Sequence, residues 1–301
     1  MTSLDLRVAT LNIGGGEKTF DDFTESTQAS RQKALELLIK QLEADVLCLQ
    51  EVTQHMDVDG QTHSLMDVIE RTDHYPHAFF GKIISMETHM QVKKDVMVKG
   101  IFSDWWNWSM GNSIHSSFPF ARLADPTRSG MPRNIPIFQP LSYEGNRDTD
   151  PRYVLLTRLK EAPHPFIANL HLTTLVGERP PDMIPRKREQ AHLMRFQQIS
   201  RFLDLVHTHI LEKNEPLIVA GDFNATEDEA GIRHLLDAHP ELMRLRPEND
   251  GPTHPDLRRA VDHIFFFPRS RLVDYTCWIE TSDLSRRASD HLPVVAELQI
   301  R

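Results

Sequence analysis

The chain has 301 residues, of which 40% are hydrophobic and 26% are charged, and its net charge is −9. This composition supplies enough apolar material for a large core and differs from that of disordered or fibrous proteins. The negative charge gives no support for tight non-specific binding to nucleic acid, although a local basic groove or bound cations would still permit a nuclease.

The N-terminal segment and the cysteines indicate the cellular compartment in which the protein is expected. Polar residues, Asp5 and Arg7, interrupt the stretch where a signal peptide would be apolar. No apolar run approaches the length of a membrane span. The chain has two cysteines, and Cys48 lies within an apolar run, which fits a reducing compartment better than a disulfide framework. We therefore expect a cytoplasmic protein without a transmembrane segment.

The first part of the chain has the pattern of a strand, a helix and a second strand. Residues 4–13 alternate loosely and run into three glycines, which predicts a strand that enters a loop. Residues 29–42 carry apolar side chains at helical spacing, and residues 45–50 are a short apolar run. This order predicts an α/β layered fold.

The segment 55–150 is less regular, with strand-like pieces at residues 77–84 and 112–123. Between these pieces, three of the four tryptophans lie in the segment Trp105–Trp108. Exposed tryptophans there could stack on bases or enter a lipid interface. A hydrophobic cluster that closes the loop is the structural alternative.

Regular patterns return in the second half of the chain. Residues 153–159 and 166–172 are typical of a hairpin, and residues 186–211 are the longest helical pattern, with Leu193 and Ile199 on its apolar face. Four further strands are predicted, at residues 216–220, 260–267, 272–279 and 292–300. Because no repeat or linker separates these patterns, we expect residues 1–301 to form a single domain.

Several apolar segments end in polar side chains of the kinds used in catalysis. In layered α/β proteins, ligands gather where strand ends meet loops, so these side chains could converge on one site. The polar tips are Asn12, Gln50 with Glu51, His171, Asp222 with Asn224, Asp262, and Asp290 with His291.

This set of side chains suits phosphoryl transfer, which needs neutralised phosphate oxygens and a positioned water. Glu51 and Asp290 are hard oxygen ligands for Mg²⁺ or Mn²⁺, and Asp222 with a histidine can act as a base and an electrostatic partner. Each motif alone has a structural explanation, such as an Asx turn at Asp222 or a helix cap at Ser289. Together they predict a metal-dependent phosphoesterase.

The same motifs resemble those of the endonuclease/exonuclease/phosphatase superfamily, which includes deoxyribonucleases, neutral sphingomyelinases, inositol polyphosphate phosphatases and deadenylases. The resemblance covers nearly the whole chain, and it implies a four-layer α/β sandwich with two mixed sheets face to face and helices outside. The matching segments are Val8–Ile13, Asp45–Val52, Ala168–Leu172, Leu217–Asn224, Val261–Phe265 and Ser289–Val294.

The resemblance also implies a metal centre. Glu51 would be the principal ligand of Mg²⁺ or Mn²⁺, and Asn12 and Asp290 would lie close to the metal or its waters.

Catalytic roles are implied for the other motif residues. Asp222 would align or deprotonate the attacking water, and Asn224 would hold the scissile phosphate. His291 would contact the phosphate, with Asp262 as the second member of its acid–base cluster. His171 would bind a phosphate oxygen or the leaving group.

Substrate contacts are predicted at two further positions. Gly111–Ile114 resembles a family stretch that places Asn112 on a strand near the site, although an arginine that often follows in the family is missing here. Arg179 and the cluster Arg186–Arg188 follow His171 and could face phosphate; a charged loop and helix start is the alternative.

The sequence thus predicts hydrolysis of a phosphodiester by water, with nucleic acid as the first expectation for the substrate. A phospholipid, an inositol phosphate or another small phosphoester is the alternative. An inactive binding module of the same fold is a second class, against which the intact motif residues argue. A serine hydrolase ranks last because the chain has no Gly-x-Ser-x-Gly motif.

Overall fold

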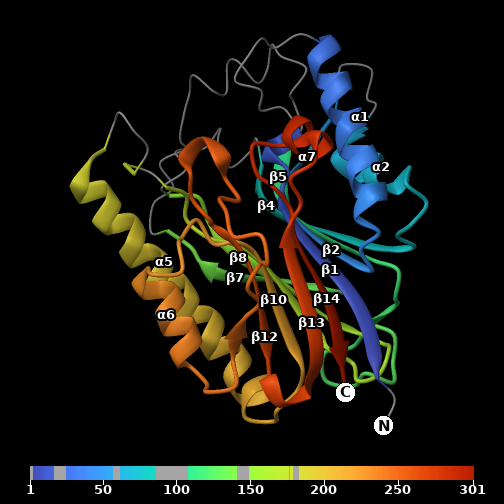
Figure 1. The fold of residues 1–301 in the computed structure, drawn as a ribbon, viewed down its shortest axis with the longest axis vertical. Coiled ribbons are helices and arrows are strands. Elements are labelled where there is room, and N and C mark those ends of the chain that lie inside the picture. Colours follow the sequence, from blue (N-terminus) through green and yellow to red (C-terminus); the bar gives the residue numbers. More distant parts are fainter. Residues whose placement is uncertain are drawn as a thin grey trace.

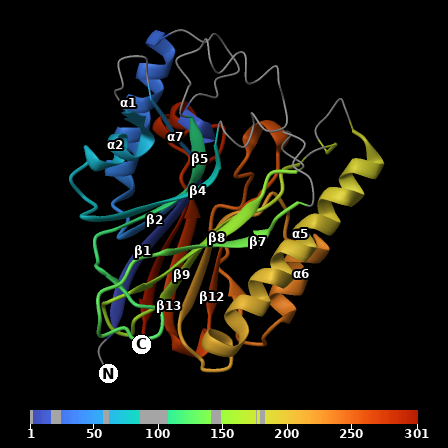
Figure 2. The same cartoon turned by 180° about the vertical axis from the view of Figure 1, so that it is seen from behind.

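The computed structural model describes residues 3–16, 25–56, 62–85, 108–140, 149–175, 177–178 and 183–301. Arg179 and residues 105–107 of the tryptophan segment lie outside the described residues. Within the described part, two seven-stranded mixed sheets pack face to face, and helices cover their outer faces (Figures 1 and 2). The predicted four-layer α/β sandwich is confirmed.

The first sheet has the strand order β13-β14-β1-β2-β5-β4, and β3 pairs with β2. Strand β1 is parallel to β2 and antiparallel to β14, so the two ends of the chain lie side by side (Figure 1). The strands are β1 (Leu4–Asn12), β2 (Val46–Met56), β3 (Thr62–Ser64), β4 (His77–Ser85), β5 (Ser109–Ser116), β13 (Leu272–Ile279) and β14 (Val294–Ile300).

The second sheet has the order β11-β12-β10-β9-β8-β6, and β7 pairs with β8. Strand β10 is parallel to β9 and antiparallel to β12. The strands are β6 (Phe120–Ala121), β7 (Arg133–Phe138), β8 (Arg152–Leu159), β9 (Phe166–His171), β10 (Leu217–Asp222), β11 (Met243–Arg244) and β12 (Asp262–Phe267).

Helices α1, α2 and α7 cover the first sheet, and α5 and α6 cover the second (Figures 1 and 2). None of the helices in the described ranges is both long and apolar enough to cross a membrane. The helices are α1 (Glu25–Leu42), α2 (Leu65–Glu70), α5 (Pro185–Val206), α6 (Ala230–Asp237) and α7 (Asp283–Ala288), and a π-helical turn (His207–Leu211) follows α5.

The central strands are apolar over most of their buried length because both of their faces are covered. Val8 of β1 packs between the sheets with Ile218 and Ala220 of β10. The alternate residues face outward, so that Ala9 lies in the core under α1 and Val219 in the core under α5. Polar residues are therefore accommodated mainly at the strand ends, which is where the candidate site forms.

Two predicted elements differ from the structure. Strand β5 ends at Ser116, well short of the predicted 123, because the chain leaves the first sheet there and joins the second as β6. Helix α5 buries Ile199 as predicted, but Leu193 is 57% exposed and Arg195 is fully buried. Apolar spacing could not reveal this, since Arg195 is buried by ion pairing with carboxylates.

A polar bridge crosses the apolar layer between the sheets. The Asn169 Nδ2 of β9 donates to the Leu49 carbonyl at 2.9 Å and to the Ser113 carbonyl at 2.9 Å, and both acceptors belong to the first sheet. The Gln50 Nε2 donates to the Asn169 Oδ1 at 2.8 Å. Gln50, one of the polar tips in the sequence, thus points between the sheets and fixes how they are stacked.

Replacement of this bridge should destabilise the protein. Asn169→Ala removes a side-chain donor from two buried carbonyls, and we expect a loss of about 2–3 kcal/mol in the free energy of unfolding. Urea denaturation measures this. As a control, Gln299→Ala removes a surface bond to Asp5 and should change stability by less than about 0.5 kcal/mol. Equal stability of the two variants would contradict the assignment.

Candidate active site

Strand register places three of the predicted side chains next to one another. Asp222 at the end of β10 lies opposite His171 of β9 and opposite Asp262 at the start of β12. Asn12 at the end of β1 pairs with Gln50 of β2, the residue before Glu51, on the facing sheet. The polar tips therefore gather at one end of the sandwich.

Gly221 permits the close approach of β9 and β10 at this end. A Cβ atom on this residue would lie 2.0 Å from the Leu170 carbonyl oxygen, and its φ of +153° is rarely adopted by other residues. The glycine therefore sets the spacing between His171 and Asp222.

Asn12 joins the two sheets within the site. Its Nδ2 donates to Asp222 Oδ2 at 2.9 Å and to Glu51 Oε1 at 3.3 Å, while its Oδ1 accepts from the Gly14 amide at 2.9 Å. The Ser289 hydroxyl donates to the Asn12 backbone carbonyl at 2.5 Å. A single asparagine thus connects four of the six motif segments.

Two site residues have left-handed backbone conformations, which are uncommon outside glycine and cluster at functional sites. Glu51 has a φ of +53° at a bulge between Leu49 and Val52, and the bulge turns its side chain into the site. Asn224 has a φ of +49°, and its backbone N–H donates to Asp222 Oδ1 at 2.8 Å. The carboxylate of Asp222 is therefore held at both oxygens.

His291 and Asp262 form a buried pair. The ring Nδ1 lies 2.9 Å from Asp262 Oδ2, so Nε2 is the nitrogen that faces the site, 3.9 Å from Asp222 Oδ2. Burial alone would lower the pKa of His291, but the charges of Asp262 and Asp222 raise it to about 10. The ring is therefore a cation at neutral pH in the metal-free protein.

His171 completes the buried group. Its Nε2 lies 3.6 Å from Asp222 Oδ2 and 3.9 Å from Glu51 Oε1, so it stands between the carboxylates of the two sheets. Seven of the predicted residues are thus in one cluster through direct contacts: Asn12, Glu51, His171, Asp222, Asn224, Asp262 and His291.

Asn112 lies on β5 at the edge of this cluster. Its side chain is 1% exposed, and neither its Nδ2 nor its Oδ1 has a hydrogen-bond partner among the described residues. It lines a small recess together with Glu51, Arg152 and His171. A buried amide without partners is costly, so Asn112 is a candidate for a contact with a polar ligand.

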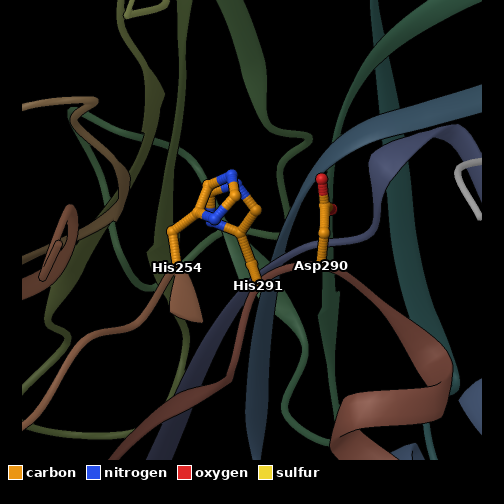
Figure 3. Close-up of side chains that lie close together, drawn as sticks. All are labelled: His254, Asp290 and His291. Atoms are coloured by element: carbon orange, nitrogen blue, oxygen red, sulfur yellow. The ribbon is translucent and has the colours of Figure 1, made fainter. Parts of the chain in front are cut away.

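Asp290 is near two residues that the sequence reading did not select. Arg31 of α1 is buried, which lowers the pKa of its guanidinium, and the charge of Asp290 opposes that shift. His254 is buried against His291, with ring centroids 4.6 Å apart (Figure 3). Arg31 lies on the same face of α1 as the apolar residues, and His254 lies in a loop. Neither position therefore indicated a functional residue in the sequence.

Arg195 holds the loops behind the site. Its guanidinium donates to Glu229 Oε1 and Glu178 Oε1, each at 2.7 Å, and to the Thr173 carbonyl at 3.2 Å. Gln198, one turn further along α5, accepts from the Thr173 amide at 3.0 Å. These bonds fix the segments that follow His171 and Asn224.

The carboxylates could hold a divalent cation. Glu51 and Asp290 offer oxygen ligands of the type that Mg²⁺ and Mn²⁺ prefer, whereas Asn12 turns its Nδ2 towards Glu51 and acts as a donor. Arg186–Arg188 lies exposed at the first turn of α5 and makes no part of this cluster, whereas the predicted Arg179 lies outside the described residues.

The charge state of His291 can be measured directly. In metal-free protein, NMR of the imidazole should show a ring protonated at both nitrogens at pH 8, and Asp262→Asn should lower the pKa by about 1–3. Because the folded pKa is raised above 6.5, this group stabilises the fold below that pH and loses its contribution as the pH rises towards 10. A ring that is neutral at pH 8 would contradict the electrostatic account.

Comparison with known proteins places this geometry in a family. The model of the endonuclease/exonuclease/phosphatase family matches residues 9–291. A comparison with curated proteins gives no match.

Solved structures share the fold at low identity. An endonuclease/exonuclease/phosphatase from Beutenbergia cavernae is 20% identical with a TM-score of 0.68, covering 98% of this chain and 72% of its own. The human Nocturnin catalytic domain with bound sulfate is 17% identical with a TM-score of 0.65 (100% and 97% covered), and truncated TDP2 from Caenorhabditis elegans is 14% identical with a TM-score of 0.59 (98% and 97%). The chain therefore belongs to the endonuclease/exonuclease/phosphatase family, whose members are generally hydrolases of phosphoesters.

Proposed function

We propose that the protein is a Mg²⁺- or Mn²⁺-dependent phosphodiesterase that cleaves its substrate by attack of water. The observation that carries this proposal is the linkage of Glu51 to Asp222 through Asn12, beside the His291–Asp262 pair. It combines an oxygen-ligand set, a fixed carboxylate base and a cationic imidazole within one buried cluster. These are the three elements that hydrolysis of a phosphoester by water needs.

Glu51 and Asp290 would hold the metal, and Asn12 would keep the Glu51 carboxylate in place. When bound, the metal neutralises charge on the phosphate oxygens. The backbone bulge at Glu51 and the bond from Ser289 to the Asn12 carbonyl support these positions.

The chain's own residues would perform the proton and charge chemistry. Asp222 would orient and deprotonate the attacking water, since bonds from Asn12 and from the Asn224 amide fix its carboxylate. His291 would donate from Nε2 to a phosphate oxygen, with Asp262 keeping its ring in place. Asp262 is thus a positioning residue.

Further donors would bind the rest of the phosphate. The Asn224 Nδ2 donates to the Leu172 carbonyl at 3.2 Å, which leaves its second amide hydrogen for substrate. His171 would bind a phosphate oxygen or the leaving group. Asn112 would supply an amide contact from the opposite sheet.

Nucleic acid is the proposed substrate class. The exposed cluster Arg186–Arg188 starts α5 at the end of the molecule towards which the strand tips point, where further backbone phosphates of a polymer would pass (Figure 1). A lipid or small phosphoester is the alternative. Hydrolysis assays with DNA and RNA oligonucleotides, phospholipid vesicles and inositol phosphates in Mg²⁺ or Mn²⁺ decide between them, and no turnover of any would support an inactive binding module.

Two sequence predictions remain part of this proposal. The apolar layer between the sheets draws on strands from the beginning, middle and end of the chain, which supports a single domain over residues 1–301. Both cysteines are free and buried, which agrees with a cytoplasmic location.

Asp222→Asn should lower turnover by about 10²- to 10⁴-fold, because the amide cannot accept a proton from water. Hydrolysis of bis-p-nitrophenyl phosphate with Mn²⁺ measures this, and an amide NMR spectrum checks the fold. Asp274→Asn, an exposed carboxylate on β13, is the matched control and should keep full activity. Equal rates for the two variants would remove Asp222 from the mechanism.

Asn112→Ala should weaken the interaction with substrate without lowering the stability of the protein. Loss of a bond to a charged phosphate should reduce kcat/KM by about 10- to 100-fold. Because the amide has no hydrogen-bond partner in the part of the chain that the structure describes, the melting temperature should stay constant or rise. A fall in both kcat/KM and melting temperature would assign Asn112 a structural role instead.

A further inference from the structure

A second group of metal-binding side chains adjoins the candidate site. One ligand atom each from His254, Asp290 and His291 lies within 4.8 Å of the other two (Figure 3). Two of these residues belong to the site already described, whereas His254 is new. The third member changes the chemistry of the group, because it adds a second imidazole to a carboxylate.

The backbone fixes His254 at this position. The N–H and C=O of His254 both bond to Arg259, and the neighbouring Thr253 hydroxyl accepts from the Asp262 amide at 3.0 Å. The Leu292 amide donates to the Thr253 carbonyl at 2.7 Å. The backbone of His254 is therefore tied to the same two segments that carry Asp262 and His291.

The ring of His291 is already oriented as a metal ligand. Its Nδ1 bonds to Asp262 Oδ2 at 2.9 Å, and Nε2 is left facing the group. A carboxylate that holds the far nitrogen of an imidazole is the usual outer partner of a metal-bound histidine, since it fixes the ring and raises its basicity.

A second group of carboxylates with a histidine has similar spacing but is less suited to hold a metal ion. Glu178, His192 and Glu229 are equally close, but Arg195 and Arg259 bond to their carboxylates at 2.7–3.0 Å. Two guanidinium groups there supply the positive charge and occupy the oxygen lone pairs. In the group of His254, the carboxylates Asp222 and Asp262 lie close to His291, and the Arg31 guanidinium acts electrostatically on Asp290.

We propose that His254, Asp290 and His291 form a second cation site that takes Zn²⁺ or a similar late transition ion in preference to Mg²⁺. Two imidazoles and one carboxylate are the donor set of such ions, whereas Mg²⁺ favours oxygen ligands. Three protein ligands also leave coordination positions open.

The site would regulate the enzyme by competition. A Zn²⁺ ion bound through His291 Nε2 would displace the Nε2 proton to solvent and so remove the donor assigned to the substrate phosphate. It would also share Asp290 with the catalytic cation. Zn²⁺ would therefore inhibit Mg²⁺-supported hydrolysis. This consequence, unlike the binding itself, rests on the proposed function.

Calorimetry of the full chain in excess Mg²⁺ tests the binding. We expect one Zn²⁺ per chain, weakened at least about tenfold in His254→Phe, which keeps an aromatic ring against His291. His192→Phe, the matched histidine of the other group, should bind Zn²⁺ as the wild type does. Unchanged affinity in His254→Phe, or an equal loss in His192→Phe, would overturn the site.

A spectroscopic measurement on the wild type covers the case in which His254→Phe does not fold. X-ray absorption of the Zn²⁺ form should show two imidazole ligands, and a shell of oxygen alone would overturn the proposal. Inhibition is scored separately: Zn²⁺ should inhibit the wild type more strongly than His254→Phe, each relative to its own Mg²⁺ rate. Zn²⁺ binding without any hydrolysis would refute the proposed function and leave the site intact.

Discussion

The hydrogen bond from Asn12 to Asp222 is the contact on which the candidate site depends. Asn12 ends a strand of one sheet and Asp222 ends a strand of the other, so this 2.9 Å bond sets the separation of the two halves. The same amide reaches Glu51, which places the proposed metal ligand at a fixed distance from the proposed base. Neither sheet alone contains a complete set of catalytic groups.

The structure separates the groups that react from those that hold them. The reactive side chains are at the strand tips, whereas the Gln50–Asn169 bridge lies deeper between the sheets and Arg195 lies behind the loops. Both supports are buried polar groups that make several hydrogen bonds each, which fix geometry more sharply than apolar packing does. Rigid placement of this kind lets a fixed carboxylate and imidazole act without reorganisation.

The sequence was sufficient for the strand tips and the fold class, for a physical reason. A strand buried on both faces is a nearly continuous apolar run, so the first polar residue after it marks the edge of the sheet, as at Asp222. The sequence did not predict polar residues that are buried because they contact residues far away in the chain. Arg195 and Gln50 interrupt apolar patterns, and His254 lies in a loop, so the contacts that explain them exist only in three dimensions.

Strand β10 has a consequence for how activity relates to folding. Ile218 and Ala220 face the layer between the sheets, and Val219 faces α5. A pairing shifted by one residue would exchange these two environments and carry Asp222 away from Asn12, although the molecule could stay compact. The measured specific activity would then depend on the fraction of chains whose strands are correctly paired. Circular dichroism cannot distinguish these chains from chains with shifted strands.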